Sequence, residues 1–152
     1  MLVLLLALAN SAVQPELPRQ WAQFSRSGHG RETVDIATGD RVKKADFRYT
    51  LRLTKRSLGA DPETAWADSA TCPAVQSVIV SMRNIQMPSP APHGRWSDSM
   101  PITLDGTLYS LTAPSSDNMG ELTISSNVGS PLASWIDASF KHLESCWTTA
   151  VS

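Results

Sequence analysis

Two cysteines, Cys72 and Cys146, constrain the fold of this chain more than any other pair of residues. They lie 74 positions apart and in no C-x-x-C arrangement, which disfavours both a zinc site and a thioredoxin-like redox motif. In an oxidising compartment, two such cysteines are expected to form one disulfide. Closing a loop of that length removes chain entropy worth roughly 4 kcal/mol from the unfolded state. The fold is therefore expected to bring these two residues together.

The first cysteine directly precedes a predicted helix. Pro73 fits the first turn, where a proline is tolerated because its missing N–H would have no partner. Thr71 or Cys72 would cap this helix, and Met87-Pro88 would end it. The apolar residues recur at helical spacing and predict one packed face. They are Val75, Val78, Ile79, Met82 and Ile85.

The second predicted helix ends at the second cysteine. Ser130 is a natural N-cap and Pro131 a first-turn proline, and Cys146 falls at the end of the helix. A disulfide would then join the start of one helix to the end of the other. Two helices lying antiparallel on one face of a sheet satisfy that geometry. The apolar stripe of this helix is Leu132, Trp135, Ile136, Phe140 and Leu143.

Alternating apolar and polar residues predict antiparallel strands in the rest of the chain. The clearest strand spans residues 47–54, with one apolar face and one polar face. This period of two is typical of a sheet that packs on one side only. The apolar face carries Phe47, Tyr49, Leu51 and Leu53, and the polar face carries Arg48, Thr50, Arg52 and Thr54. Further strands are predicted at residues 21–24, 33–37, 102–104, 108–111 and 121–125.

Glycine-containing turns are expected to reverse the chain between these strands. The turn signals are Ser27-Gly28-His29-Gly30, Thr38-Gly39-Asp40 and Asp105-Gly106. Residues 57–71 are polar and are expected to connect a strand to the first helix. We therefore expect an α+β fold, with an antiparallel sheet of about five to six strands, two helices packed on one face and one disulfide. The expected order is β-β-β-α-β-β-β-α.

The N-terminal residues predict export. Residues 1–14 contain an apolar run followed by small residues and indicate a secretory signal peptide, leaving residues 15–152 as a single domain. The signal is atypical because no Lys or Arg precedes the apolar run; the alternative is a buried N-terminal strand. The run is too short to span a membrane. We expect a periplasmic or secreted monomer without a transmembrane segment after leader removal.

Charge is unevenly distributed along the chain. The net charge of -1 argues against nucleic-acid binding, which normally needs a strongly basic balance. Residues 41–56 nevertheless contain seven basic side chains against one acidic side chain. Arg48 and Arg52 share a strand face there and could hold an anionic envelope component or an acidic protein. The alternative is a charged edge strand that prevents sheets from aggregating.

Two other segments are candidate binding sites. The proline-rich segment 87–100 is expected to be stiff and could present Trp96, with His93 and Arg95 beside it, as an anchor for a protein partner. Alternatively, Trp96 folds back over the sheet. His29 lies between two glycines and could belong to a small anion-binding or catalytic loop; alternatively, this segment is only a turn.

No catalytic, metal or cofactor motif stands out. The chain has no G-x-S-x-G sequence and no phosphate-binding or dinucleotide fingerprint, and its histidines lie in three separate segments. His142 and Cys146 could share a helix face as ligands, but only without the disulfide. We expect an exported, non-enzymatic binding or inhibitory module of the bacterial envelope, without metal or cofactor. The alternative is a small envelope hydrolase or anion-binding enzyme that uses His29.

The order of these features resembles one family. A strand with Ser27-Gly28-His29-Gly30, an amphipathic helix, a strand with Tyr109 and a helix beginning Gly129-Ser130-Pro131-Leu132 are similar to emfourin-type bacterial domains over most of residues 21–147. Some of those domains inhibit thermolysin-like metalloproteases, so the resemblance implies an inhibitory role. The cysteines and the proline-rich connector depart from that pattern, so no inhibitory residue is assigned. The short leader and two late cysteines also resemble small exported bacterial proteins.

Overall fold

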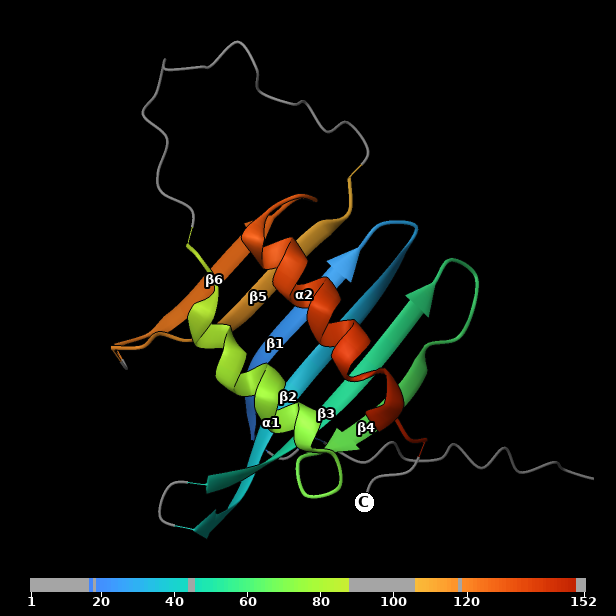
Figure 1. The fold of residues 1–152 in the computed structure, drawn as a ribbon. Helices are drawn as coiled ribbons and strands as arrows, with labels where there is room; N and C mark the ends of the chain where they lie inside the picture. The colour runs from blue at the N-terminus through green and yellow to red at the C-terminus, as the bar shows by residue number, and fades with distance from the viewer. Residues whose placement is uncertain (1–16, 18, 44–45, 88–105, 118, 150–152) are drawn as a thin grey trace, which may run out of the picture.

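A single antiparallel sheet with two helices on one face forms the fold in this computed structural model (Figure 1). The structure describes residues 17, 19–43, 46–87, 106–117 and 119–149. Within them the sheet has six strands in the order β4-β3-β2-β1-β5-β6. The strands are β1 (Gln20–Ser27), β2 (Gly30–Lys43), β3 (Asp46–Ser57), β4 (Glu63–Asp68), β5 (Leu108–Pro114) and β6 (Glu121–Ser126). The helices are α1 (Pro73–Ser81) and α2 (Pro131–His142), followed by the short 3₁₀ turns Met82–Asn84 and Glu144–Cys146.

The predicted fold class is confirmed, but the predicted order of elements is wrong at one strand. Along the described residues the order is β-β-β-β-α-β-β-α, because β4 lies inside the segment expected to be a polar connection. The side chains of β4 that lie opposite Leu51 and Leu53 are only alanines, Ala67 and Ala65, so the strand gives a weak apolar signal. The predicted strand at residues 102–104 lies outside the described residues, as does Asp105 of the predicted turn.

The predicted reversal at Thr38-Gly39-Asp40 is also wrong. Strand β2 continues through this segment to Lys43 and stays paired with β3. The register between the two strands shifts between Thr38 and Arg41 and again between Arg41 and Lys43. Irregularities of this kind let a strand bend without leaving its partner. The glycine signal therefore marks a bend in a long strand instead of a turn.

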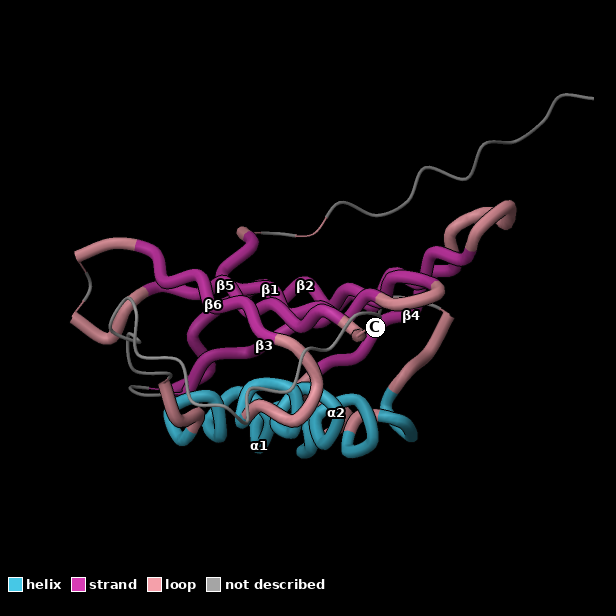
Figure 2. The backbone as a smooth tube through the Cα atoms, turned by 90° about the horizontal axis from the view of Figure 1, so that it is seen from above, coloured by secondary structure: helices cyan, strands magenta, loops and turns pink. Residues whose placement is uncertain are grey.

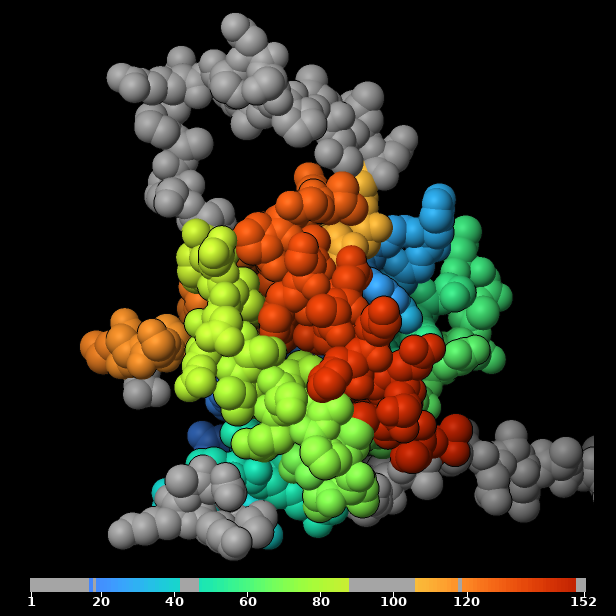
Figure 3. All heavy atoms as spheres, in the orientation of Figure 1, coloured from blue at the N-terminus to red at the C-terminus, as the bar shows by residue number. Residues whose placement is uncertain are grey.

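The core lies between the sheet and the two helices. Figure 2 shows both helices in one layer below the sheet, and Figure 3 shows them covering this side of the molecule. Phe24 is fully buried and makes edge-on contacts with the rings of Trp135 and Phe140, at centroid distances of 5.2 and 5.6 Å. Each large apolar side chain buried here contributes roughly 1.5–3 kcal/mol. Other fully buried members are Val34, Ile36, Leu51, Val75, Ile136 and Leu143.

The two helices are joined at both ends. Cys72, the N-cap of α1, forms the predicted disulfide with Cys146, which follows α2, and their Cα atoms are 5.8 Å apart. At the opposite end the indole N–H of Trp135 donates a hydrogen bond to the hydroxyl of Ser81, at 2.8 Å. The hydroxyl of Ser130 caps α2 by accepting from the backbone N–H of Ala133, at 3.0 Å. The disulfide and the Trp135–Ser81 bond join the two helices to each other, and the Ser130 cap stabilises the start of α2.

The C-terminal part of the chain protects one edge of the sheet. After Cys146, the backbone of Thr148 exchanges two hydrogen bonds with Trp66 on the edge strand β4, at 2.7 and 2.8 Å. Pairing of this kind satisfies backbone groups that an edge strand would otherwise leave open. Among the described residues, no helix has the length and apolar character needed to cross a membrane.

Loss of the disulfide is expected to lower stability without changing the fold. The variant Cys72→Ser/Cys146→Ser should lose roughly 4 kcal/mol of unfolding free energy, because the unfolded chain regains the freedom of the long loop. Urea unfolding followed by tryptophan fluorescence measures the loss. A reductant should lower the midpoint of the wild-type chain and leave that of the double variant unchanged. Equal midpoints for wild type and variant would contradict the stabilising role of the bond.

Candidate functional site

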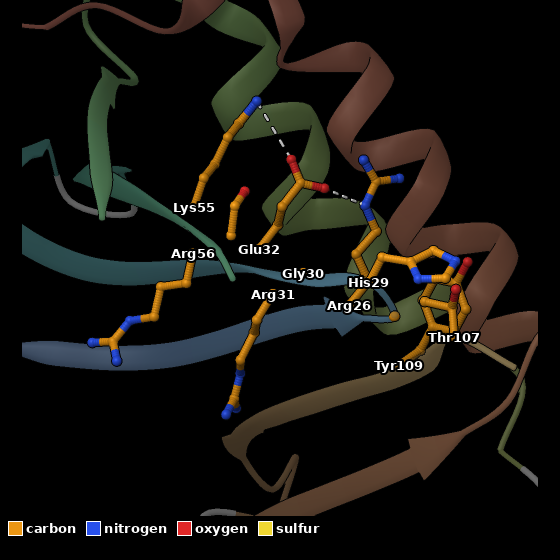
Figure 4. A pocket seen from close by; sticks show the side chains of 11 residues that line it. Arg26, His29, Gly30, Arg31, Glu32, Lys55, Arg56, Thr107 and Tyr109 are labelled. Atoms are coloured by element: carbon orange, nitrogen blue, oxygen red, sulfur yellow. Dashed lines mark hydrogen bonds and ion pairs between the residues drawn. The ribbon is translucent and has the colours of Figure 1, made fainter. Parts of the chain in front are cut away.

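A cleft of about 390 Å³ lies at one end of the sheet, around the turn between β1 and β2 (Figure 4). Its walls come from the ends of β1, β2, β3 and β5, so four strands position its side chains. Four basic side chains line it against one acidic side chain, which makes the cleft electropositive. The lining residues are Arg26, Gly28, His29, Gly30, Arg31, Glu32, Lys55, Arg56, Ser57, Thr107 and Tyr109.

The turn at this cleft requires a glycine because another backbone passes close to it. The backbone N–H of Gly28 donates to the carbonyl oxygen of Gly30, at 2.9 Å, and closes the predicted hairpin. A Cβ atom at Gly30 would lie 2.9 Å from the carbonyl oxygen of Arg56 on the neighbouring strand. His29 is therefore held at the tip of a tight turn, exposed, and beside the end of β3.

On the helix side of the cleft, charged groups form a network with α2. The guanidinium of Arg26 pairs with Glu32 at 2.6 Å and with Asp137 of α2 at 2.8 Å, and lies 4.3 Å from the ring centre of Phe140. The phenol of Tyr109 donates to the other oxygen of Asp137, at 2.9 Å. These contacts fix the angle at which α2 crosses β1 and β5, so the network stabilises the wall of the cleft.

The titration of two groups reflects this network. Partial burial alone would lower the pKa of Arg26, but the hydrogen bonds to Asp137 and Glu32 and the negative charges of these two residues together raise it. Burial raises the pKa of the Tyr109 phenol, and its hydrogen bond to the Asp137 carboxylate raises the pKa further. Both shifts favour the protonated forms, in which Arg26 is positively charged and Tyr109 donates to Asp137.

On the opposite side of the sheet the cleft ends in two arginines that face each other. Arg31 of β2 and Arg56 of β3 are directly opposite in the strand register, and both are exposed. Figure 4 shows their side chains extending away from Glu32 and Lys55. Neither has an ion-pair partner among the residues that the structure describes. Like charges in this position repel, so the arrangement is unfavourable unless an anion joins them.

Arg48 and Arg52, which were predicted to bind an anionic partner, lie on one strand face as expected, but each is paired. Arg48 bonds to Asp68 at 2.9 Å and Arg52 bonds to Asp35 at 2.9 Å, and both carboxylates are buried. Strand β3 lies between β2 and β4, so the alternative of a charged edge strand is wrong. Removing either arginine would leave a buried carboxylate without its counter-ion.

Three of the other predicted site residues, Trp96, His93 and Arg95, lie outside the described residues. His142 is exposed in the last turn of α2, and Cys146 is held in the disulfide, so it is not available as a thiolate ligand. Among the described residues, no cluster of three or more His, Cys, Asp or Glu could hold a metal ion. Of the predicted binding residues that the structure describes, only His29 lines the cleft.

Comparison with known proteins gives no further assignment, since no family model, curated protein or solved structure matches this chain.

Substitution of Gly30 by Ala is expected to destabilise the hairpin. The added Cβ would press on the backbone carbonyl of Arg56, a contact that costs about 1–3 kcal/mol. Gly120→Ala is the matched control, because no atom lies within 4 Å of a Cβ at that position. The urea midpoints of the two variants should differ clearly. Equal midpoints would show that the β3 backbone does not limit residue 30.

Tyrosine absorbance should report the Tyr109–Asp137 hydrogen bond. The chain contains two tyrosines, and the titration curve should include a component above the ordinary pKa of 10.0 that Tyr109→Phe removes. Because the pKa is raised in the folded state, the stabilising contribution of the protonated phenol is present below the ordinary pKa. It is lost as the pH rises through the raised value. Titration curves of equal shape for both proteins would contradict the bond.

Proposed function

We propose that this chain is an exported, non-enzymatic binding module of the bacterial envelope, which holds an anionic partner at the cleft of the β1–β2 hairpin. One observation carries the proposal: Arg31 and Arg56 face each other on neighbouring strands, exposed and without a counter-ion among the described residues. Export rests on residues 1–14 and on the disulfide, which is typical of oxidising compartments.

The two arginines suit a carboxylate, sulfate or phosphate group. A guanidinium presents its N–H donors in a planar fork that matches two oxygens of such an anion. A single anion between Arg31 and Arg56 would convert their repulsion into two attractions. Arg48 and Arg52 differ in this respect, because buried carboxylates of the same chain already occupy them. Arg31 and Arg56 are therefore the better candidate binding site for an anionic ligand.

The cleft supports binding more directly than catalysis. The imidazole of His29 has no hydrogen-bond partner among the described residues, so no carboxylate orients it as a general base. Asp137 and Tyr109 are bonded to each other, and Asp137 also pairs with Arg26. The hydrolase alternative thus has no specific observation in its favour. The resemblance to emfourin-type domains would imply that the anionic partner is a protease.

Anion binding by the full chain can be measured by calorimetry with tripolyphosphate at low salt. Each of Arg31→Ser and Arg56→Ser should weaken binding by about tenfold, because one charge-assisted contact is lost. Added salt should weaken the wild-type affinity, since the site is exposed. Each single variant should also be slightly more stable than wild type without ligand, because the cross-strand repulsion is relieved. A variant that binds more weakly but unfolds at a higher urea concentration has lost the binding site and not the fold.

The matched control removes the same charge from the helix layer. Arg83→Ser/Lys141→Ser changes two exposed basic residues, one beyond α1 and one on α2. It should bind tripolyphosphate as the wild type does. Equal losses in this control and in Arg31→Ser/Arg56→Ser, or no loss in the latter, would contradict the proposed site.

A further inference from the structure

The face of the sheet opposite the helices carries a continuous row of hydroxyl side chains. Strand pairing brings one serine or threonine from each of the six strands into a line perpendicular to the strands. At about 4.8 Å between strands, this line is roughly 24 Å long. From β6 to β4 the row consists of Ser125, Ser110, Ser25, Thr33, Thr54 and Thr64, and we call it the hydroxyl row.

In the described part of the chain, no helix covers this face (Figure 2). The side chains of the hydroxyl row alternate along each strand with buried residues of the core, such as Phe24, Val34 and Leu53, and therefore point the other way. Ser125 is exposed at the β6 end of the row, Ser25 on β1 is buried, and Thr33 and Thr54 on β2 and β3 are half-buried. The row is thus accessible at its β6 end and at Thr33 and Thr54, but not at Ser25.

On one side of the hydroxyl row, the next line of side chains across the strands already makes hydrogen bonds within the chain. Gln23 and Arg52 both donate to Asp35, at 2.6 and 2.9 Å, and the hydroxyls of Thr112 and Thr123 lie 3.2 Å apart. Thr33 and Thr54 differ, because their hydroxyls have no hydrogen-bond partner among the described residues. The adjacent row therefore stabilises the sheet. Within the hydroxyl row, Ser125 donates to Ser110 at 3.5 Å, whereas the hydroxyls of Thr33 and Thr54 are available to a ligand.

The row on the other side contains the unpaired arginines. Arg31 and Arg56 lie two residues from Thr33 and Thr54 on the same strands, and so on the same face. A ligand that lies along the hydroxyl row passes beside both guanidinium groups. On β2 and β3 the surface therefore combines the neutral hydroxyls of Thr33 and Thr54 with the positive charge of Arg31 and Arg56.

We propose that this surface binds an acidic polysaccharide, a chain of sugars with carboxylate groups, which lies across the strands. This inference rests on the proposed function and names the class of its ligand. The carboxylates would pair with Arg31 and Arg56, and the sugar hydroxyls would bond to Thr33 and Thr54.

The direction of the row favours a polysaccharide over a polypeptide. An extended peptide adds to a sheet by pairing with the backbone of an edge strand, parallel or antiparallel to it. A ligand that crosses the strands meets only side chains. Hydroxyls of threonine both donate and accept, as sugar hydroxyls do, so a sugar chain that crosses β2 and β3 can bond to Thr33 and Thr54 in turn. Charge complementarity with the two arginines selects an acidic chain over a neutral one.

The test uses calorimetry of the full chain with oligogalacturonate, neutral dextran, polyglutamate and tripolyphosphate. Thr33→Val/Thr54→Val removes two hydroxyls with little change in shape or strand preference. It should weaken oligogalacturonate binding by about tenfold and leave tripolyphosphate binding unchanged. Thr112→Val/Thr123→Val is the matched control on the same face, and it should bind oligogalacturonate as the wild type does. Dextran should bind at least tenfold more weakly than oligogalacturonate.

Two results would overturn this inference and leave the proposed function intact. One is that Thr33→Val/Thr54→Val and Thr112→Val/Thr123→Val bind oligogalacturonate with equal affinity, while tripolyphosphate binding still depends on Arg31 and Arg56. The other is binding of polyglutamate as tight as that of oligogalacturonate, which would make the ligand a polypeptide. Tripolyphosphate binding that does not depend on the two arginines would instead contradict the proposed function, and the inference with it.

Discussion

The structure depends on the attachment of both helices to one face of the sheet. Most apolar side chains of the strands point to that face, and the disulfide and the Trp135–Ser81 hydrogen bond hold the two ends of the helix pair together there. The other face is consequently mainly polar, with Trp66 as a buried exception opposite Arg52, and its polar residues must satisfy their own hydrogen bonds or meet solvent or a ligand. The position of the core thus decides which surface is available for binding.

The charged residues divide into two groups with different roles. Arg26, Arg48 and Arg52 each bond to carboxylates of this chain and stabilise the packing of strands and helices. Arg31 and Arg56 are brought together by the same strand register without such a carboxylate among the described residues. A like-charge pair that destabilises the free protein is a better indicator of a binding site than the number of basic residues in a segment.

The elements with strong local signals could be predicted from the sequence. The alternation over residues 47–54 indicated which face packs, and the two first-turn prolines marked where the helices begin. Strand β4 was missed because its inward residues are alanines. The pairing of the arginines could not be predicted, because the partners of Arg48 and Arg52 are set by strand register, and Tyr109 meets Asp137 only through the packing of α2. The hydroxyl row is likewise a product of register, with one member from each strand.

The central claim is that the helix-free face is the ligand surface. Methyl NMR of the full chain with labelled threonine, valine and isoleucine tests it most directly, because these methyl groups lie on both faces. With oligogalacturonate added, the account predicts that the signals of Thr33 and Thr54 shift, while those of Val75, Val78 and Ile136 in the helix layer do not. Shifts confined to the helix layer, or no shift at Thr33 and Thr54 at saturating ligand, would contradict it.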